Sequence, residues 1–94
     1  MPAFALSYTY DATTAPARDE VRPRHVEFLQ QQYDDGRLRI SGPVDSGAGA
    51  LLVVTGDDEQ DVLTLMDGDP FAEEGLIAKR SVLRWDVFFG KDKL

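Results

Sequence analysis

The chain has 94 residues, of which 43% are hydrophobic and 10% aromatic, and its 17 acidic and 10 basic residues give a formal net charge of -7. A chain of this length fills one hydrophobic core, so we expect a single domain over residues 1–94, and its charge disfavours binding to nucleic acid or to an anionic membrane. It has no cysteine, a single histidine and no apolar run long enough for a membrane span, so the sequence predicts no disulfide, no metal site and a cytoplasmic location.

The first third of the chain predicts a strand, a loop and a helix. Residues 4–10 alternate large apolar or aromatic residues with small or polar ones, which is typical of a strand. The polar residues 11–20 predict a loop. The helix is expected to have Pro23 in its first turn and to stop at Gly36, with an apolar stripe facing the core. The stripe consists of Val26, Leu29 and Tyr33.

Two strands come next. Residues 37–43 alternate arginine with Leu38 and Ile40, which predicts a short strand that carries these two residues on one face. Residues 50–55 form an uninterrupted apolar run, which is typical of a strand covered on both faces.

The last third predicts a helix and a long final strand. Asp57 or Asp58 is a natural N-cap for a helix that carries apolar residues at helical spacing. Those apolar residues are Val62, Leu65 and Met66. The final strand is expected within residues 76–90, and one of its faces is apolar. That face consists of Leu83, Trp85, Val87 and Phe89.

The order β-α-β-β-α-β predicts an α+β fold, a ferredoxin-like βαββαβ sandwich with an antiparallel sheet and two helices on one face. The helices cover only one face of the sheet, while the central and last strands carry apolar residues on both. We therefore expect a homodimer that packs through the open sheet face. The alternative is an amphipathic sheet whose aromatic face is exposed to water.

Two residues are the main candidates for chemistry. His25 is the only histidine and is expected in the first turn of the first helix, where the helix dipole favours a neutral imidazole. The alternative is an ordinary surface histidine. Asp69 precedes Pro70, a pair typical of an N-cap and the first helical residue. Its functional interpretation is that the carboxylate orients the imidazole and fixes its tautomer.

Other polar residues have weaker cases. Ser41 lies at the end of a predicted strand and offers a hydroxyl, although a hydrogen-bonded structural serine is the simpler interpretation. Arg22 and Arg37 could hold an anionic substrate or lie on a solvated charged face. Trp85 fits the sheet or dimer core better than a substrate platform.

Three motifs together resemble the YciI-like (YCII-related domain) family. They are Arg-Pro-Arg-His at residues 22–25, Gly-Arg-Leu leading to Gly-Pro within residues 36–43, and Asp-Pro-Phe at residues 69–71. The resemblance covers essentially the whole chain, in the order and spacing of the family. It implies a dimeric α+β-barrel and a His–Asp pair in a pocket between helix ends and sheet, and the matching residues are His25 and Asp69.

The resemblance also implies a class of reaction. One branch of the family resembles a dehydrochlorinase that eliminates HCl from a chlorinated hydroxyhydroquinone, while most members have no assigned reaction. We therefore expect a lyase or isomerase that acts on a small cyclic or aromatic compound and needs no metal or organic cofactor. The alternative is a non-catalytic dimeric module of the same fold that binds a small ligand or another protein.

The expected site has two catalytic and four binding residues. His25 and Asp69 form the catalytic pair, and the small-molecule substrate contacts Arg22, Ser41, Pro70 and Phe71. The segment between the second and third strands is shorter than is usual for the family, which would leave the pocket more open.

Overall fold

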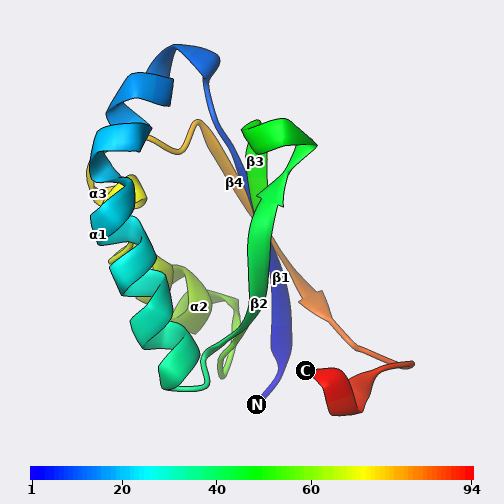
Figure 1. Cartoon of the computed structure of the whole chain (residues 1–94). Coiled ribbons are helices and arrows are strands. Elements are labelled where there is room, and N and C mark those ends of the chain that lie inside the picture. The colour runs from blue at the N-terminus through cyan, green and yellow to red at the C-terminus, as the bar shows by residue number, and fades with distance from the viewer.

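The computed structural model describes residues 1–94 and contains one four-stranded sheet (Figure 1). The strands are β1 (Ala3–Thr9), β2 (Leu38–Val44), β3 (Gly49–Thr55) and β4 (Lys79–Trp85). They lie in the order β2-β3-β1-β4, and every neighbouring pair is antiparallel. This order confirms the predicted ferredoxin-like arrangement.

Three helices lie together on one side of the sheet (Figure 1). The long helix α1 (Ala15–Asp34) connects β1 to β2, and α2 (Glu59–Met66) and the short α3 (Pro70–Glu73) connect β3 to β4. Asp58 is the N-cap of α2, one of the two predicted aspartates, and its side chain accepts a hydrogen bond from the backbone N–H of Asp61. No helix is both long enough and apolar enough to cross a membrane.

The predicted loop at residues 11–20 is wrong, because most of it belongs to α1. The Asp11 carboxylate accepts from the Thr13 backbone and starts a turn of 3-10 helix that leads into α1 at Ala15. Pro16 lies in the first turn, where its missing N–H has no helical partner to lose. Pro23 therefore lies inside the helix and not at its start.

The buried face of α1 also differs from the prediction. Val26 and Tyr33 are exposed, whereas the buried residues are Arg18, His25 and Gln32. These three recur every seven residues, which is two helical turns, so they share one face. The helix thus directs polar side chains toward the interior of the molecule. This arrangement indicates that the region between α1 and the sheet contains polar groups as well as apolar ones.

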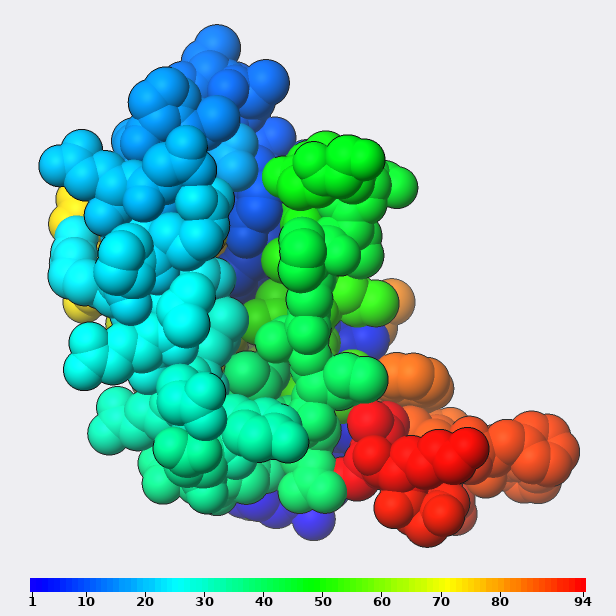
Figure 2. Space-filling view, in the orientation of Figure 1, coloured from blue at the N-terminus to red at the C-terminus, as the bar shows by residue number.

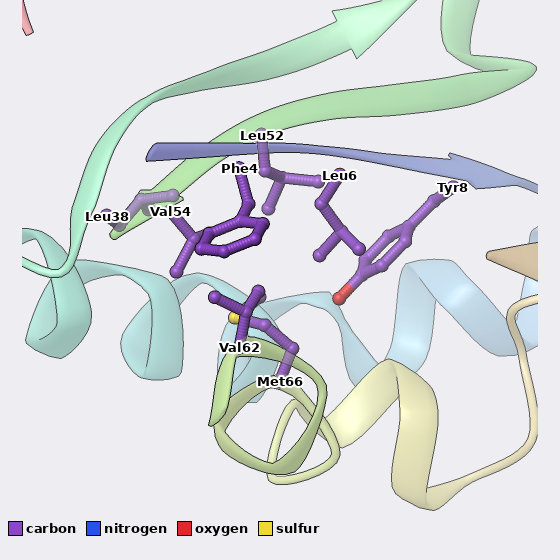
Figure 3. Packing of buried hydrophobic residues seen from close by; sticks show 8 residues of the cluster. All are labelled: Phe4, Leu6, Tyr8, Leu38, Leu52, Val54, Val62 and Met66. Atoms are coloured by element: carbon purple, nitrogen blue, oxygen red, sulfur yellow. The ribbon is translucent and has the colours of Figure 1, made fainter. Parts of the chain in front are cut away.

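The apolar core lies between the sheet and α2 (Figure 3). Alternate residues of β1 point into it, as the strand pattern predicts, and meet residues from β2, β3 and α2. The eight buried members are Phe4, Leu6, Tyr8, Leu38, Leu52, Val54, Val62 and Met66. Figure 3 shows Tyr8 at one end of this cluster, with its hydroxyl directed toward the helical layer.

None of the three α-helices covers the other face of the sheet, which carries exposed apolar residues. Ile40 lies on this face and is 58% exposed, contrary to the prediction that it shares a face with buried Leu38. The reason is a register shift between Leu38 and Ile40, which reverses the side of every following residue in β2. Leu83 and Trp85 lie on the same face.

The predicted final strand is too long. β4 ends at Trp85, and Phe88 and Phe89 lie beyond it with most of their surface exposed. Residues past β4 turn away from the helical layer, in orange and red in Figure 1.

We predict that Pro23→Ala raises the free energy of unfolding. Proline inside a helix removes one backbone hydrogen bond and crowds the preceding turn, and Pro23 is exposed, so no packing is lost. The expected gain is about 1–3 kcal/mol in urea unfolding. Exposed Glu27→Ala on the same helix is the control and should change stability by about 0.5 kcal/mol or less. Equal changes in the free energy of unfolding for both variants would mean that Pro23 does not destabilise α1.

Candidate active site

A buried hydrogen bond joins the two main candidates from the sequence. The Nδ1 atom of His25, in α1, lies 2.7 Å from Oδ1 of Asp69, the N-cap of α3. The Asp69 side chain is fully buried and that of His25 is 11% exposed. The contact exists because α1 and α3 pack against each other. The sequence placed both residues near helix ends, whereas the structure places His25 in the middle of α1, far from the positive end of its dipole.

Asp69 is both a helix cap and the partner of the histidine. Its Oδ1 accepts from the Phe71 backbone N–H at 2.9 Å as well as from His25, and its Oδ2 accepts from the Tyr8 hydroxyl at 3.2 Å. The two roles therefore share one oxygen. An ionised carboxylate accepts hydrogen bonds and donates none, so three converging donors match that form.

The Asp69 contact fixes the tautomer of His25. Because Nδ1 donates to the carboxylate, the neutral ring carries its free lone pair on Nε2. The ring is also stacked on Phe71, with centroids 3.8 Å apart and planes 4° from parallel. Two contacts therefore hold the imidazole in one orientation, which is the usual arrangement for a base that must meet a substrate proton.

Tyr8 belongs to this site, and the sequence analysis missed it. Burial raises the pKa of the Tyr8 phenol well above its ordinary value of 10.0, and the nearby Asp69 carboxylate raises it further. The phenol therefore stays protonated and keeps donating to Asp69. A tyrosine at a core position of a strand needs a partner for its hydroxyl, and that signal was present in the sequence.

A cavity of about 530 Å³ opens beside His25, between α1 and the β2–β3 hairpin. In Figure 2 the cyan helix and the green hairpin border the hollow. Three of the four predicted binding residues line it, namely Arg22, Ser41 and Phe71. Pro70 does not line the cavity and is buried in the first turn of α3.

The remaining candidates lie elsewhere. Arg37 donates to the Thr55 carbonyl oxygen and pairs with Asp61, so it joins β2, β3 and α2. Trp85 lies on the open sheet face and is half-exposed. No group of three or more histidine and acidic side chains is arranged to hold a metal ion.

We predict that the protein loses stability above pH 10. The unfolded chain releases the Tyr8 proton near its ordinary pKa of 10.0, while the folded chain retains it because its pKa is raised. Below pH 10 the Tyr8 phenol is protonated in both the folded and the unfolded chain, so it does not change the free energy of unfolding with pH. Above it, the free energy of unfolding falls by about 1.4 kcal/mol per pH unit for this phenol.

Urea unfolding between pH 8 and pH 11 measures this slope. Tyr8→Phe should reduce it, whereas Tyr33→Phe, which removes an exposed phenol, should leave it unchanged. A slope that Tyr8→Phe does not alter would show that the buried phenol is not its source.

Solved structures with this fold include one of a dehydrochlorinase. 5-Chloro-2-hydroxyhydroquinone dehydrochlorinase (TftG) from Burkholderia phenoliruptrix AC1100, in complex with 2,5-dihydroxybenzoquinone, is 20% identical and superposes with a TM-score of 0.79 over 92% of this chain and 95% of that one. A NIPSNAP domain protein from Burkholderia xenovorans is 15% identical, with a TM-score of 0.56 over 95% and 96% of the two chains.

A third similar structure is a putative antibiotic biosynthesis monooxygenase from Nitrosomonas europaea, 9% identical with a TM-score of 0.56 over 95% of this chain and all of that one. At these identities the likenesses show a shared fold alone. No curated protein sequence matches the chain. The model of the YCII-related domain, however, matches residues 1–86, so this chain belongs to the YCII-related domain family.

Proposed function

We propose that this YciI-like domain, residues 1–94, is an acid–base enzyme that acts on a small cyclic or aromatic compound by elimination or isomerisation. The observation that carries the proposal is a buried imidazole beside a cavity, with Nδ1 bonded to a carboxylate and Nε2 free. His25 is the base and Asp69 positions it. Arg22, Ser41 and Phe71 contact the substrate from the cavity wall.

The size and lining of the cavity support a substrate with one ring. Its volume of about 530 Å³ lies within the usual range for small-molecule sites, and apolar side chains alternate there with a few polar groups. Phe71 already stacks on His25. A planar substrate whose edge faces the imidazole would place an acidic proton in the plane of the His25 ring, where the Nε2 lone pair lies.

Dehydrochlorination is the reaction we propose to test first, because a similar structure belongs to a dehydrochlorinase. In a chlorinated hydroxyhydroquinone, Nε2 takes a proton from a ring hydroxyl and delivers it to the carbon that bears chlorine, which becomes tetrahedral. A second hydroxyl proton then goes to Nε2 while the C–Cl bond breaks and its electron pair leaves as chloride. The product is a quinone, and the net change is loss of HCl without oxidant or reductant.

We predict that the protein releases chloride from 5-chloro-2-hydroxyhydroquinone and that His25→Gln lowers kcat by about 10²–10⁴-fold, the usual contribution of a positioned acid–base group. Asp69→Asn should lower kcat as well, because its amide cannot accept from three donors. A chloride electrode follows the reaction directly.

Arg24→Gln is the matched control. Arg24 lies on the same helix, next to His25, but is exposed and pairs with Glu74 outside the cavity. Its kcat should equal that of the wild type. Chloride release that survives His25→Gln would remove His25 from the mechanism.

We also propose that a second copy of the chain covers the open sheet face. The same dimer would form if the protein were a non-catalytic binding module of the same fold. Ile40, Leu83 and Trp85 expose apolar surface there, and β4 forms one edge of the sheet. Exposed apolar area of this kind favours association. A chain of 94 residues buries a smaller fraction of its surface on folding than a large protein does, so the apolar surface buried in a dimer adds more to its stability.

Light scattering at micromolar concentration should give twice the 10.4 kDa mass of the chain. Leu83 is 70% exposed on the open sheet face. Leu83→Asp places a charge there and should give the monomer mass. Gln31→Asp adds the same charge to an exposed position of α1, far from the open face, and should remain dimeric. A wild-type mass of 10.4 kDa would contradict the dimer.

A further inference from the structure

Arg18 is a buried cation without an acidic partner. Its residue exposure is only 7%, and it lines the cavity. Nε donates to the Thr14 hydroxyl at 3.1 Å, and Nη2 donates to the Asp11 carbonyl oxygen at 3.2 Å. Nη1 donates to no protein group. Every buried side-chain nitrogen of the chain has a hydrogen-bond partner. Nη1 has none, so it is not buried and is in contact with solvent. Arg18 lines the cavity, which is the open space beside it.

The other arginines differ from Arg18. Five of them form ion pairs with a carboxylate, and Arg39 is exposed to water. The paired ones are Arg22, Arg24, Arg37, Arg80 and Arg84. Hydrogen bonds from Thr13 lower the pKa of the exposed Asp11 carboxyl, and the Arg18 guanidinium lowers it further, but the two side chains form no ion pair. The buried charge of Arg18 is costly unless an anion meets it, and the Tyr10 ring, 4.4 Å from the guanidinium carbon, compensates only in part.

The cavity wall is positive although the chain is negative. Among the residues that line it, the ionisable ones are Arg18, Arg22, His25 and two tyrosines, with no aspartate or glutamate. The Asp69 charge is fully buried and is held by its three donors. A ligand in this cavity therefore meets cations and hydroxyl donors but no exposed carboxylate.

We propose that the cavity binds a small planar ligand that carries an oxyanion, as a carboxylate or an acidic ring hydroxyl, and that Arg18 is the residue that pairs with this charge. Arg18 and His25 lie two turns apart on the same face of α1, about 10 Å along its axis. A single ring with its oxygen substituents fits between their side chains. The oxyanion at Arg18 then holds the opposite edge of the ring toward Nε2 of His25.

This inference rests on the proposed function only in taking the cavity as the ligand site, and it specifies the class of ligand. Benzoate and benzamide are suitable probes, since they have the same ring and shape and differ in charge. NMR titration follows the ring signals of His25, the only histidine, and the side-chain Nε–H signal of Arg18. We expect benzoate to bind about 10- to 100-fold more tightly than benzamide, the usual gain of a charge-assisted hydrogen bond.

Arg18→Gln should reduce the preference for benzoate to about one, with little change for benzamide. Arg24→Gln, which removes the same charge from an exposed position of α1, should keep the full preference. If Arg18→Gln does not fold, the NMR titration of the wild-type protein tests the role of Arg18. Benzoate must then shift the Arg18 Nε–H signal and benzamide must leave it in place.

Three results would overturn the inference: equal affinity for both probes, a preference that survives Arg18→Gln, or no binding of either probe. Its failure and that of the proposed function are distinguishable. Selective benzoate binding without chloride release supports the anion site and counts against the elimination. Chloride release without any preference for the anion supports the elimination and refutes the role of Arg18.

Discussion

The buried carboxylate of Asp69 is the interaction on which the site depends. It joins three elements that are distant in the sequence, since it accepts from Tyr8 of β1, His25 of α1 and the backbone at the start of α3. Burying a charge costs several kcal/mol unless hydrogen bonds satisfy it, and here three do. The same three bonds set the entry of α3, the orientation of the imidazole and its tautomer, so the packing of three elements and the geometry of the proposed base depend on one group.

The apolar stripe predicted on α1 is real, but two of its three residues, Val26 and Tyr33, are exposed and do not belong to the core. Val26, Leu29 and Tyr33 all line the cavity, and of these only Leu29 also packs against the core, while the buried residues of the helix are the polar Arg18, His25 and Gln32. Periodicity indicates which residues share a face and cannot tell whether that face meets protein or an open pocket. The stripe on α1 lines a cavity, and this placement is the reason why the core prediction was wrong for Val26 and Tyr33.

The sequence predicted the order of elements and the cap at Asp69 because both depend on local patterns, namely alternation in strands and the Asp-Pro pair. The start of α1 was missed because Pro23 is a common helix-starting signal, and the chain uses Pro16 instead. Ile40 was placed on the wrong face because a register shift leaves no clear mark in the sequence. Arg18 could not be singled out from the sequence, because its burial and its lack of an ion pair depend on contacts that only the fold reveals.

The net charge of -7 and the positive cavity are compatible because they act over different distances. Exposed carboxylates are screened by salt within about 8–10 Å, so most of them contribute little inside the cavity. Arg18 is buried at its wall and is screened much less. The overall charge therefore disfavours long anionic polymers, which must approach the whole surface. For a single small anion inside the cavity, by contrast, the closest charge on the wall that forms no ion pair is that of Arg18, which is why we propose it as the partner of the ligand.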